Sequence, residues 1–223
     1  MKRFYILVIG IYVCLGISAQ TANDVIKKMQ EIRQESGDSI ARDYLTRNQS
    51  IFISEDANPT YLVLWGVLTS NMWNSNPSEK LRIEYKKYLD SAIDDEIKSE
   101  TYTPDQASLP TIWQLTRDYY LILYRDGDRE GALKLLKCIH RWFRPYPDAR
   151  NTVGYAQTLL DYCLLLVRDM HKYEEGMPYA EEYLTVSKSV YGENSAQYAV
   201  ALYNMHIFPS KPISEKAEII KIL

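Results

Sequence analysis

Residues 172–204 read KYEEGMPYAEEYLTVSKSVYGENSAQYAVALYN, and they return tyrosine, alanine and leucine in an order that the chain has already used one helical pair earlier. The interval between matching residues is 43 or 44 positions. Such a period predicts stacked helix hairpins, because one hairpin cannot bury its apolar face alone and each packs on the next. The matching pairs are Tyr155 and Tyr198, Ala156 and Ala199, Leu159 and Leu202, Leu115 and Leu159, and Ala132 and Gly176.

Helical spacing extends over most of the chain, since apolar residues recur at steps of three and four almost throughout. We therefore expect an all-α fold of stacked antiparallel helix hairpins. The polar stretch KSETYTPDQASLP, residues 98–110, is the expected linker. The expected helices cover about 25–32, 39–48, 60–73, 81–97, 111–124, 132–143, 156–167, 173–190 and the residues from 195 onward.

The first residues have the layout of a secretory signal peptide, with cleavage expected after Ala19. Lys2 and Arg3 precede an uncharged apolar run of 14 residues, 4–17, which is shorter than the ~20 residues that a membrane-spanning helix needs. Cys14 suggests a lipoprotein site as an alternative, but the residues before it are not small. We expect export to a periplasmic or extracellular location, with no membrane span after cleavage.

Composition and charge exclude some function classes. The chain has 223 residues, 46% of them hydrophobic, and its net charge of −3 gives no basic field for nucleic acid. Cys138 and Cys163 lie on apolar helical stripes of neighbouring helices, about seven residues out of register. We expect two buried free thiols rather than a disulfide.

From residue 109 to residue 205 the chain resembles tetratricopeptide-repeat proteins, and in particular the longer repeats of the kinesin light chain type. The likeness rests on GDREGALKLL at 127–136, HKYEEGMPY at 171–179 and VYGENSAQYAVALYNM at 190–205. Pro178 lies where the longer repeats place a proline. His171 and Gly176 depart from the pattern, because the family usually has glycine and alanine there.

The resemblance implies that the hairpins form a short right-handed superhelix. Together with the N-terminal features, it suggests four segments along the chain. Residues 1–19 form the signal peptide, and 20–105 form a helical segment in which SEDANPTYLVLWGVL is interpreted as a worn copy of the repeat. Residues 106–207 hold the repeats. Residues 208–223 form a capping helix or the remainder of a longer array, and a short array leaves a hairpin face available for self-association.

No catalytic motif is present in the sequence. His140, His171 and His206 lie in different hairpins without a matching acid or thiol, so we expect a non-enzymatic protein that binds neither cofactor nor metal. We expect His140 to be exposed beside Arg141 and His171 to lie in a turn.

The first helices of such repeats line a groove that commonly binds extended peptides. Positions matching the family's groove asparagines are Asp161 and Asn204, and Tyr162 and Tyr203 are expected to flank them. The alternative is that these tyrosines only pack between hairpins.

A basic stripe offers a second candidate surface. Lys134, Lys137, Arg141 and Arg144 share one helical face and predict docking of an acidic peptide, a phosphate or an anionic glycan. The alternative is a solvated helix face.

Taken together, these features predict an exported interaction module that holds a peptide or protein partner in a groove. The alternative function is that of a sensory or regulatory segment of a larger exported signalling or protease-linked protein.

Overall fold

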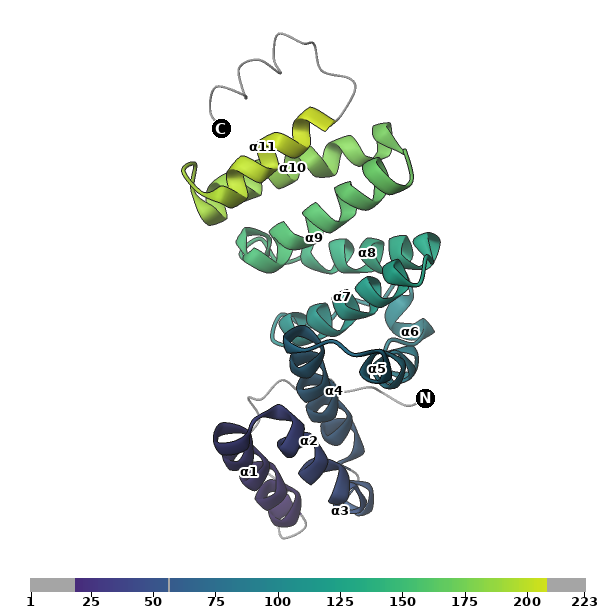
Figure 1. Ribbon diagram of the computed structural model, residues 1–223, viewed down its shortest axis with the longest axis vertical. Helices are drawn as coiled ribbons and strands as arrows, with labels where there is room; N and C mark the ends of the chain where they lie inside the picture. Colours follow the sequence, from purple (N-terminus) through teal and green to yellow (C-terminus); the bar gives the residue numbers. More distant parts are fainter. Residues whose placement is uncertain (1–18, 56, 208–223) are drawn as a thin grey trace. The chain divides into compact units, whose positions relative to one another are not determined.

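The computed structural model describes residues 19–55 and 57–207, which fold into helices α1 to α11 (Figure 1). No β-strand occurs in these described residues, so the predicted all-α class is confirmed. The predicted signal peptide, apart from Ala19, and the predicted C-terminal helix lie outside them. No described helix is both long enough and apolar enough to cross a membrane.

The chain divides into two compact units, and the division falls inside helix α7 (Leu109–Arg125). Unit 1 combines the residues up to Ile97 with Pro104–Ile122, and unit 2 combines Lys98–Thr103 with the residues from Leu123. The expected linker is therefore shared by the two units.

Unit 1 begins with four helices around one apolar core. They are α1 (Ala19–Ser36), α2 (Asp38–Arg47), α3 (Gln49–Ser54) and α4 (Asn58–Ser75). Helix α2 packs against α1 and α4. A left-handed Gly37 (φ 85°) makes the sharp turn between α1 and α2, a conformation that glycine adopts without steric cost. The core residues are Ala22, Val25, Met29, Ala41, Leu45, Phe52, Tyr61 and Leu68.

Helix α5 (Glu79–Ala92) packs against α4. Ser78 caps it, since the Ser78 hydroxyl accepts from the Leu81 amide at 3.2 Å. The helix expected over 81–97 is broken, because α5 ends at Ala92 and a single turn, α6 (Asp95–Lys98), follows after Ile93 and Asp94. The short helix α3 was not predicted either.

Unit 2 holds the most regular part of the chain. Its helices are α8 (Arg129–Phe143), α9 (Val153–Leu164), α10 (Tyr173–Tyr191) and α11 (Ala196–Ile207). Each packs against the next along the chain. A 3₁₀ turn (Ala149–Asn151) precedes α9, and a π-helical turn (Leu165–Asp169) ends it.

Backbone features in unit 2 recur at the predicted interval. Thr152 and Ser195, 43 residues apart, each cap a helix by accepting from the amide three residues on. Gly127 and His171, 44 residues apart, are both left-handed, with φ of 85° and 55°. Gln157 lies 43 residues after Gln114, whereas His171 lies 44 residues after Gly127, so the later segment holds one residue more. The π-helical turn lies in that segment and takes up the extra residue, because a π turn closes over one residue more than an α turn. The superhelix itself stays a prediction.

Both cysteines that the sequence placed in helical stripes are buried and free, as predicted. The Cys138 thiol donates to the Lys98 carbonyl at 3.4 Å, and the Cys163 thiol donates to the Leu160 carbonyl at 3.3 Å. Burial raises the pKa of Cys138, and it raises that of Cys163 to about 12. Both thiols are therefore protonated and serve as small core side chains.

Candidate functional site

A buried carboxylate, Asp118 of α7, holds three helices of unit 1 together. It is 0% exposed. Its Oδ2 accepts from the hydroxyls of Ser70 at 2.5 Å and Tyr85 at 2.8 Å. Its Oδ1 accepts from Gln114 Nε2 at 2.9 Å and from Asn74 Nδ2 at 3.5 Å. The donors come from α4, α5 and α7 itself, so the carboxylate serves as a hydrogen-bonded hub.

The electrostatics of this hub follow from its burial. Burial raises the pKa of Asp118, and the four hydrogen bonds offset only part of that rise. Burial together with the Asp118 charge raises the pKa of Tyr85 well above its usual range. All four donors are uncharged, so the lone pairs of the carboxylate are used by neutral groups.

A pocket of about 190 Å³ lies beside this hub, between α4 and α7. Gln114 and Ser70 form part of its wall, and both donate to Asp118. The hub therefore fixes two of the polar groups that face the pocket. The lining residues are Val67, Ser70, Asn71, Pro110, Thr111, Gln114 and Leu115.

Unit 2 contains a second copy of the same hydrogen bond. Gln157 Nε2 of α9 donates to Asp161 Oδ1 at 3.0 Å, and both residues lie 43 positions after Gln114 and Asp118. We call Gln114–Asp118 and Gln157–Asp161 the Gln–Asp couples. The sequence analysis missed Gln114, Asp118 and Gln157, although the spacing Gln-x-x-x-Asp repeated after 43 residues was a signal for them.

The predicted groove residues are divided between core and surface. Asp161 and Asn204 are each 8% exposed, on α9 and α11. Tyr162 is 3% exposed and packs on Tyr179, with ring centroids 4.0 Å apart. The packing alternative therefore holds for Tyr162. Tyr203 is 56% exposed and is the one of the two tyrosines that remains accessible.

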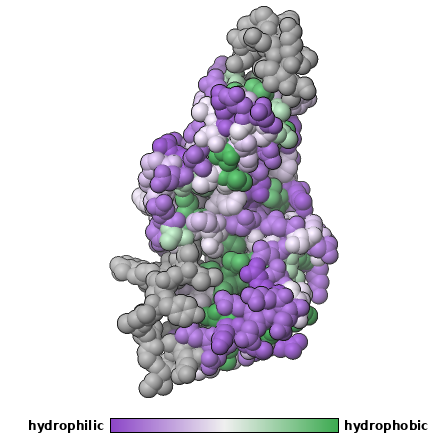
Figure 2. Space-filling view, turned by 90° about the vertical axis from the view of Figure 1, so that its left-hand side faces the viewer, coloured by the Kyte–Doolittle hydropathy of each residue, from purple (hydrophilic) through white to green (hydrophobic). Residues whose placement is uncertain are grey.

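The exposed apolar side chains are scattered. The face of the molecule drawn in Figure 2 shows hydrophobic patches between larger hydrophilic areas. Tyr203 and Val200 lie three residues apart on α11, and both are exposed. Among the residues that the structure describes, the other large apolar side chains that are exposed are Ile40, Ile53, Ile83, Val153 and Tyr173.

The basic stripe is only partly available to a ligand. Lys134, Lys137 and Arg144 are exposed, as predicted. Arg141 is half-buried instead, and its Nη2 donates to the Ser99 carbonyl at 2.6 Å. Arg141 therefore ties the segment after α6 to α8, and three cations remain on the surface.

His140 is buried, and the prediction that it is exposed beside Arg141 was wrong. It is 9% exposed, because it follows the fully buried Leu136 by four residues and so lies on the same apolar face of α8. Its ring stacks on Tyr155 at 5.9 Å and meets Tyr179 edge-on at 5.1 Å. We call His140, Tyr155, Tyr162, Tyr179 and Glu182 the histidine cluster.

Glu182 is the acid of this cluster. It accepts from the Tyr155 hydroxyl at 2.6 Å, and its other oxygen lies 3.7 Å from His140 Nε2. Burial lowers the pKa of His140, and the Glu182 charge opposes this only in part. The ring is therefore neutral at pH 7, and the cluster is a packed meeting point of α8, α9 and α10.

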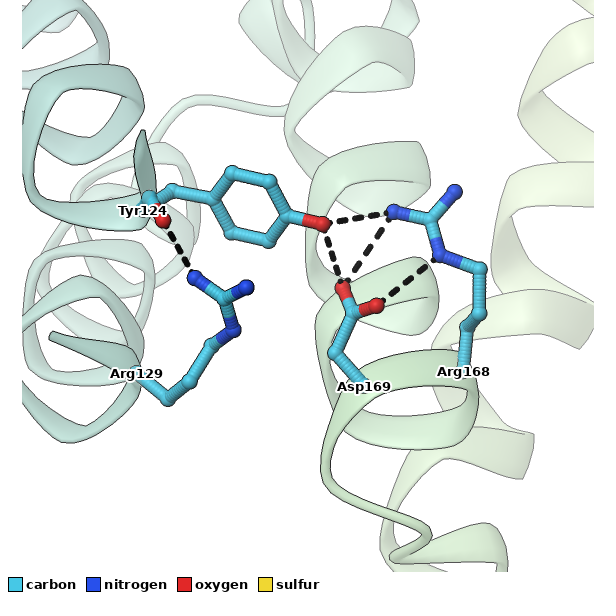
Figure 3. Close-up of polar contacts among 4 residues, drawn as sticks. All are labelled: Tyr124, Arg129, Arg168 and Asp169. Atoms are coloured by element: carbon cyan, nitrogen blue, oxygen red, sulfur yellow. Dashed lines mark hydrogen bonds and ion pairs between the residues drawn. The ribbon is translucent and has the colours of Figure 1, made fainter. Parts of the chain in front are cut away.

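A second polar cluster joins the end of α7 to the π-helical turn (Figure 3). The Tyr124 hydroxyl donates to Asp169 at 2.8 Å and accepts from Arg168 at 2.8 Å. Arg129 lies over the Tyr124 ring, 4.0 Å from its centroid, and donates to the Tyr124 carbonyl. Tyr124 and Arg168 are 44 residues apart, so these contacts join equivalent ends of two successive hairpins.

Asp169 pairs with Arg168 in this cluster, and Arg129 adds a second positive charge. Burial pushes the pKa of Asp169 upward, but hydrogen bonds from Arg168 and Tyr124 and the Arg168 charge outweigh it, so the pKa is lowered. Asp169 is therefore ionised and paired with Arg168, and the arrangement suits a clamp between hairpins better than a ligand site.

Neither the histidines nor the acids assemble into a metal site within residues 19–55 and 57–207, where no three potential ligands converge. His171 lies in the turn before α10, as predicted, and is exposed. The side chain of His206 lies outside the described part.

Comparisons with known proteins add no relative. No protein-family model matches the chain, and neither a curated protein nor a solved structure matches it.

Proposed function

We propose that this chain is an exported, non-enzymatic binding module that holds an extended peptide segment of a protein partner. The peptide lies against a helix that carries a Gln–Asp couple, α7 in unit 1 or α9 in unit 2. The recurrence of these couples after 43 residues is the observation that carries the proposal. If each hairpin contacts the peptide through the same position, a Gln–Asp couple is expected once per hairpin, as at Gln114–Asp118 and Gln157–Asp161.

The chemistry of the couple supports this function. In each couple the NH₂ group of the glutamine donates to the aspartate, Gln114 to Asp118 and Gln157 to Asp161. The amide oxygen of each glutamine then points away from the aspartate. An acceptor of fixed orientation suits the backbone N–H groups of an extended peptide, which have no partner of their own.

Unit 2 holds two further residues that can contact a peptide. Asn204 occupies the position 43 residues after Asp161, and Tyr203 beside it presents an exposed ring. A tyrosine ring gives a large contact area at a low cost in conformational entropy. The resemblance to tetratricopeptide repeats leads to the same function.

The proposal is tested by selecting random linear peptides on the full chain and measuring the affinity of the peptides that are enriched. Gln114→Met with Gln157→Met keeps side-chain length but removes both amide oxygens. We expect this double variant to bind the selected peptides about tenfold more weakly or worse.

The matched control is Lys134→Ala with Lys137→Ala, which changes the basic stripe and leaves both Gln–Asp couples intact. Peptides should bind this variant with unchanged affinity. The proposal is overturned if no peptide is enriched, or if the stripe variant loses binding while the glutamine variant keeps it.

A further inference from the structure

The pocket beside Gln114 has a definite size and lining. We propose that it takes one uncharged aliphatic side chain, such as that of leucine, from the bound peptide. This inference rests on the proposed function and adds the side-chain preference of unit 1. The pocket has about 190 Å³ of space and lies between α4 and α7.

The volume fits a medium-sized side chain. A cavity of about 150 Å³ lined by apolar groups is large enough for benzene. The pocket is somewhat larger than that, and Val67, Pro110 and Leu115 give it apolar walls. An isobutyl group therefore fits and buries its surface against these walls, and each buried methylene group contributes about 0.8 kcal/mol to binding in general.

The charge of the pocket selects against ionised side chains. None of the seven lining residues is charged. The nearby Asp118 carboxylate already accepts from four donors, among them Ser70 and Gln114 of the pocket wall. A ligand cation would have to compete with these bonds, and a ligand anion would lose its hydration without gaining a counter-charge. Complementarity of charge thus points to a neutral side chain.

The polar part of the lining suits the backbone next to that side chain. The Asn71 and Thr111 side chains make no hydrogen bond within the described residues, and Gln114 uses only its NH₂ group. These three side chains offer donors and acceptors at the same pocket. A peptide that inserts its side chain can pair its neighbouring N–H and C=O groups there.

The test compares capped tripeptides on the full chain by NMR titration. Acetyl-Ala-Leu-Ala-amide is the main probe, and the same tripeptides with aspartate or lysine in the middle are the comparators. The leucine peptide should shift the signals of Val67, Thr111 and Leu115 in a saturable way. It should bind at least about tenfold more tightly than either charged peptide.

A pocket-filling variant checks the location. Thr111→Leu occupies the space and should weaken the leucine peptide at least about fivefold. Thr185→Leu, at an exposed position of α10, is the matched control and should have no effect. If Thr111→Leu fails to fold, Val67→Ala replaces it. That variant enlarges the pocket and should raise the affinity of a phenylalanine peptide relative to the leucine peptide.

The outcomes separate this inference from the proposed function. Equal binding of the three peptides, or shifts at Gln157 and Asn204 without shifts at the pocket, overturns the aliphatic pocket and leaves peptide binding in place. The absence of any shift in both units contradicts the inference and the proposed function together.

Discussion

The two Gln–Asp couples show how one local arrangement can have two different burials. Gln114–Asp118 and Gln157–Asp161 share spacing and hydrogen bond, with donor–acceptor distances of 2.9 and 3.0 Å. Asp118 is 0% exposed and accepts further bonds from α4 and α5, whereas Asp161 is 8% exposed. The four-residue spacing within one helix is enough to form the couple. Hydrogen bonds from neighbouring helices determine how much the couple contributes to the stability of the fold.

The turns after these helices differ in a complementary way. In the first copy Gly127 is left-handed and Ala132 is buried in the next helix. In the second copy His171 takes the left-handed turn and Gly176 takes the helical position. A Cβ atom at Gly176 would collide with the Val167 side chain of the π-helical turn. The extra residue of the π-helical turn and the absence of a side chain at Gly176 are therefore linked.

The largest effect is expected for the loss of the hub. Asp118→Ala leaves the buried hydroxyls of Ser70 and Tyr85 without their acceptor and should lower the free energy of unfolding by about 3 kcal/mol. Asp161→Ala, the matched change in the second copy, should cost about 1 kcal/mol. Urea unfolding measures both. Equal costs, or a larger cost at Asp161, would contradict the difference in burial.

The link between the π-helical turn and Gly176 is tested next. Gly176→Ala should lower the free energy of unfolding by about 2 kcal/mol, because the new methyl group overpacks against Val167. A β-branched side chain cannot easily rotate away. Combining it with Val167→Ala should recover part of the loss, so the two changes should be non-additive in a double-mutant cycle. Simple additivity would show that the two residues are not coupled.

The histidine cluster predicts that the free energy of unfolding depends on pH, and replacing His140 by leucine should remove this dependence. Burial lowers the pKa of His140 below 6.5 in the folded state, while the unfolded chain keeps the ordinary value. The unfolded state then binds more protons as the pH falls below about 6.5, so the folded protein loses stability. His140→Leu, which copies Leu184 44 residues later, should flatten this part of the profile.

Urea unfolding between about pH 7.5 and about 5.5 measures the effect. The matched control is His171→Leu, since His171 is exposed in its turn. The prediction is wrong if the pH profile of His140→Leu keeps the slope of the unmodified protein.

The smallest effect is expected at the left-handed turn. His171→Gly relieves a backbone conformation that costs a residue with a Cβ atom about 1 kcal/mol, but it adds entropy to the unfolded chain. The net gain should be no more than about 0.5 kcal/mol. Gly127→Ala should instead cost about 1 kcal/mol, since its φ is 85°. Thermal unfolding measures the stability of both variants. The prediction is wrong if Gly127→Ala is the more stable of the two.

Much of the fold could be predicted from apolar spacing. The expected helices over 111–124 and 173–190 agree closely with α7 and α10. The period of 43 to 44 residues was visible in the sequence, but the π-helical turn that follows α9 was not. Apolar spacing cannot distinguish the hydrogen-bond pattern of a single turn. The break between α5 and α6 was missed for the same reason, because Ile93 and Ile97 continue the apolar spacing.

The candidate site was harder to predict. Asp118 was not singled out from the sequence, because its role depends on donors 33 and 48 residues away, Tyr85 and Ser70. His140 was placed on the surface because of its neighbour Arg141, although its position four residues after Leu136 indicated burial. Asp161 and Asn204 were located from the resemblance, whereas Gln157, which donates to Asp161, could have been found from the repeated Gln-x-x-x-Asp spacing.

Hydrogen exchange of the full chain, with and without a saturating selected peptide, tests the binding role of the Gln–Asp couples most directly. The account predicts slower exchange at residues 111–118 or 157–161, where the couples lie, and unchanged exchange along α8, which carries the basic stripe. Slowing confined to α8, or no slowing at either couple, would contradict it.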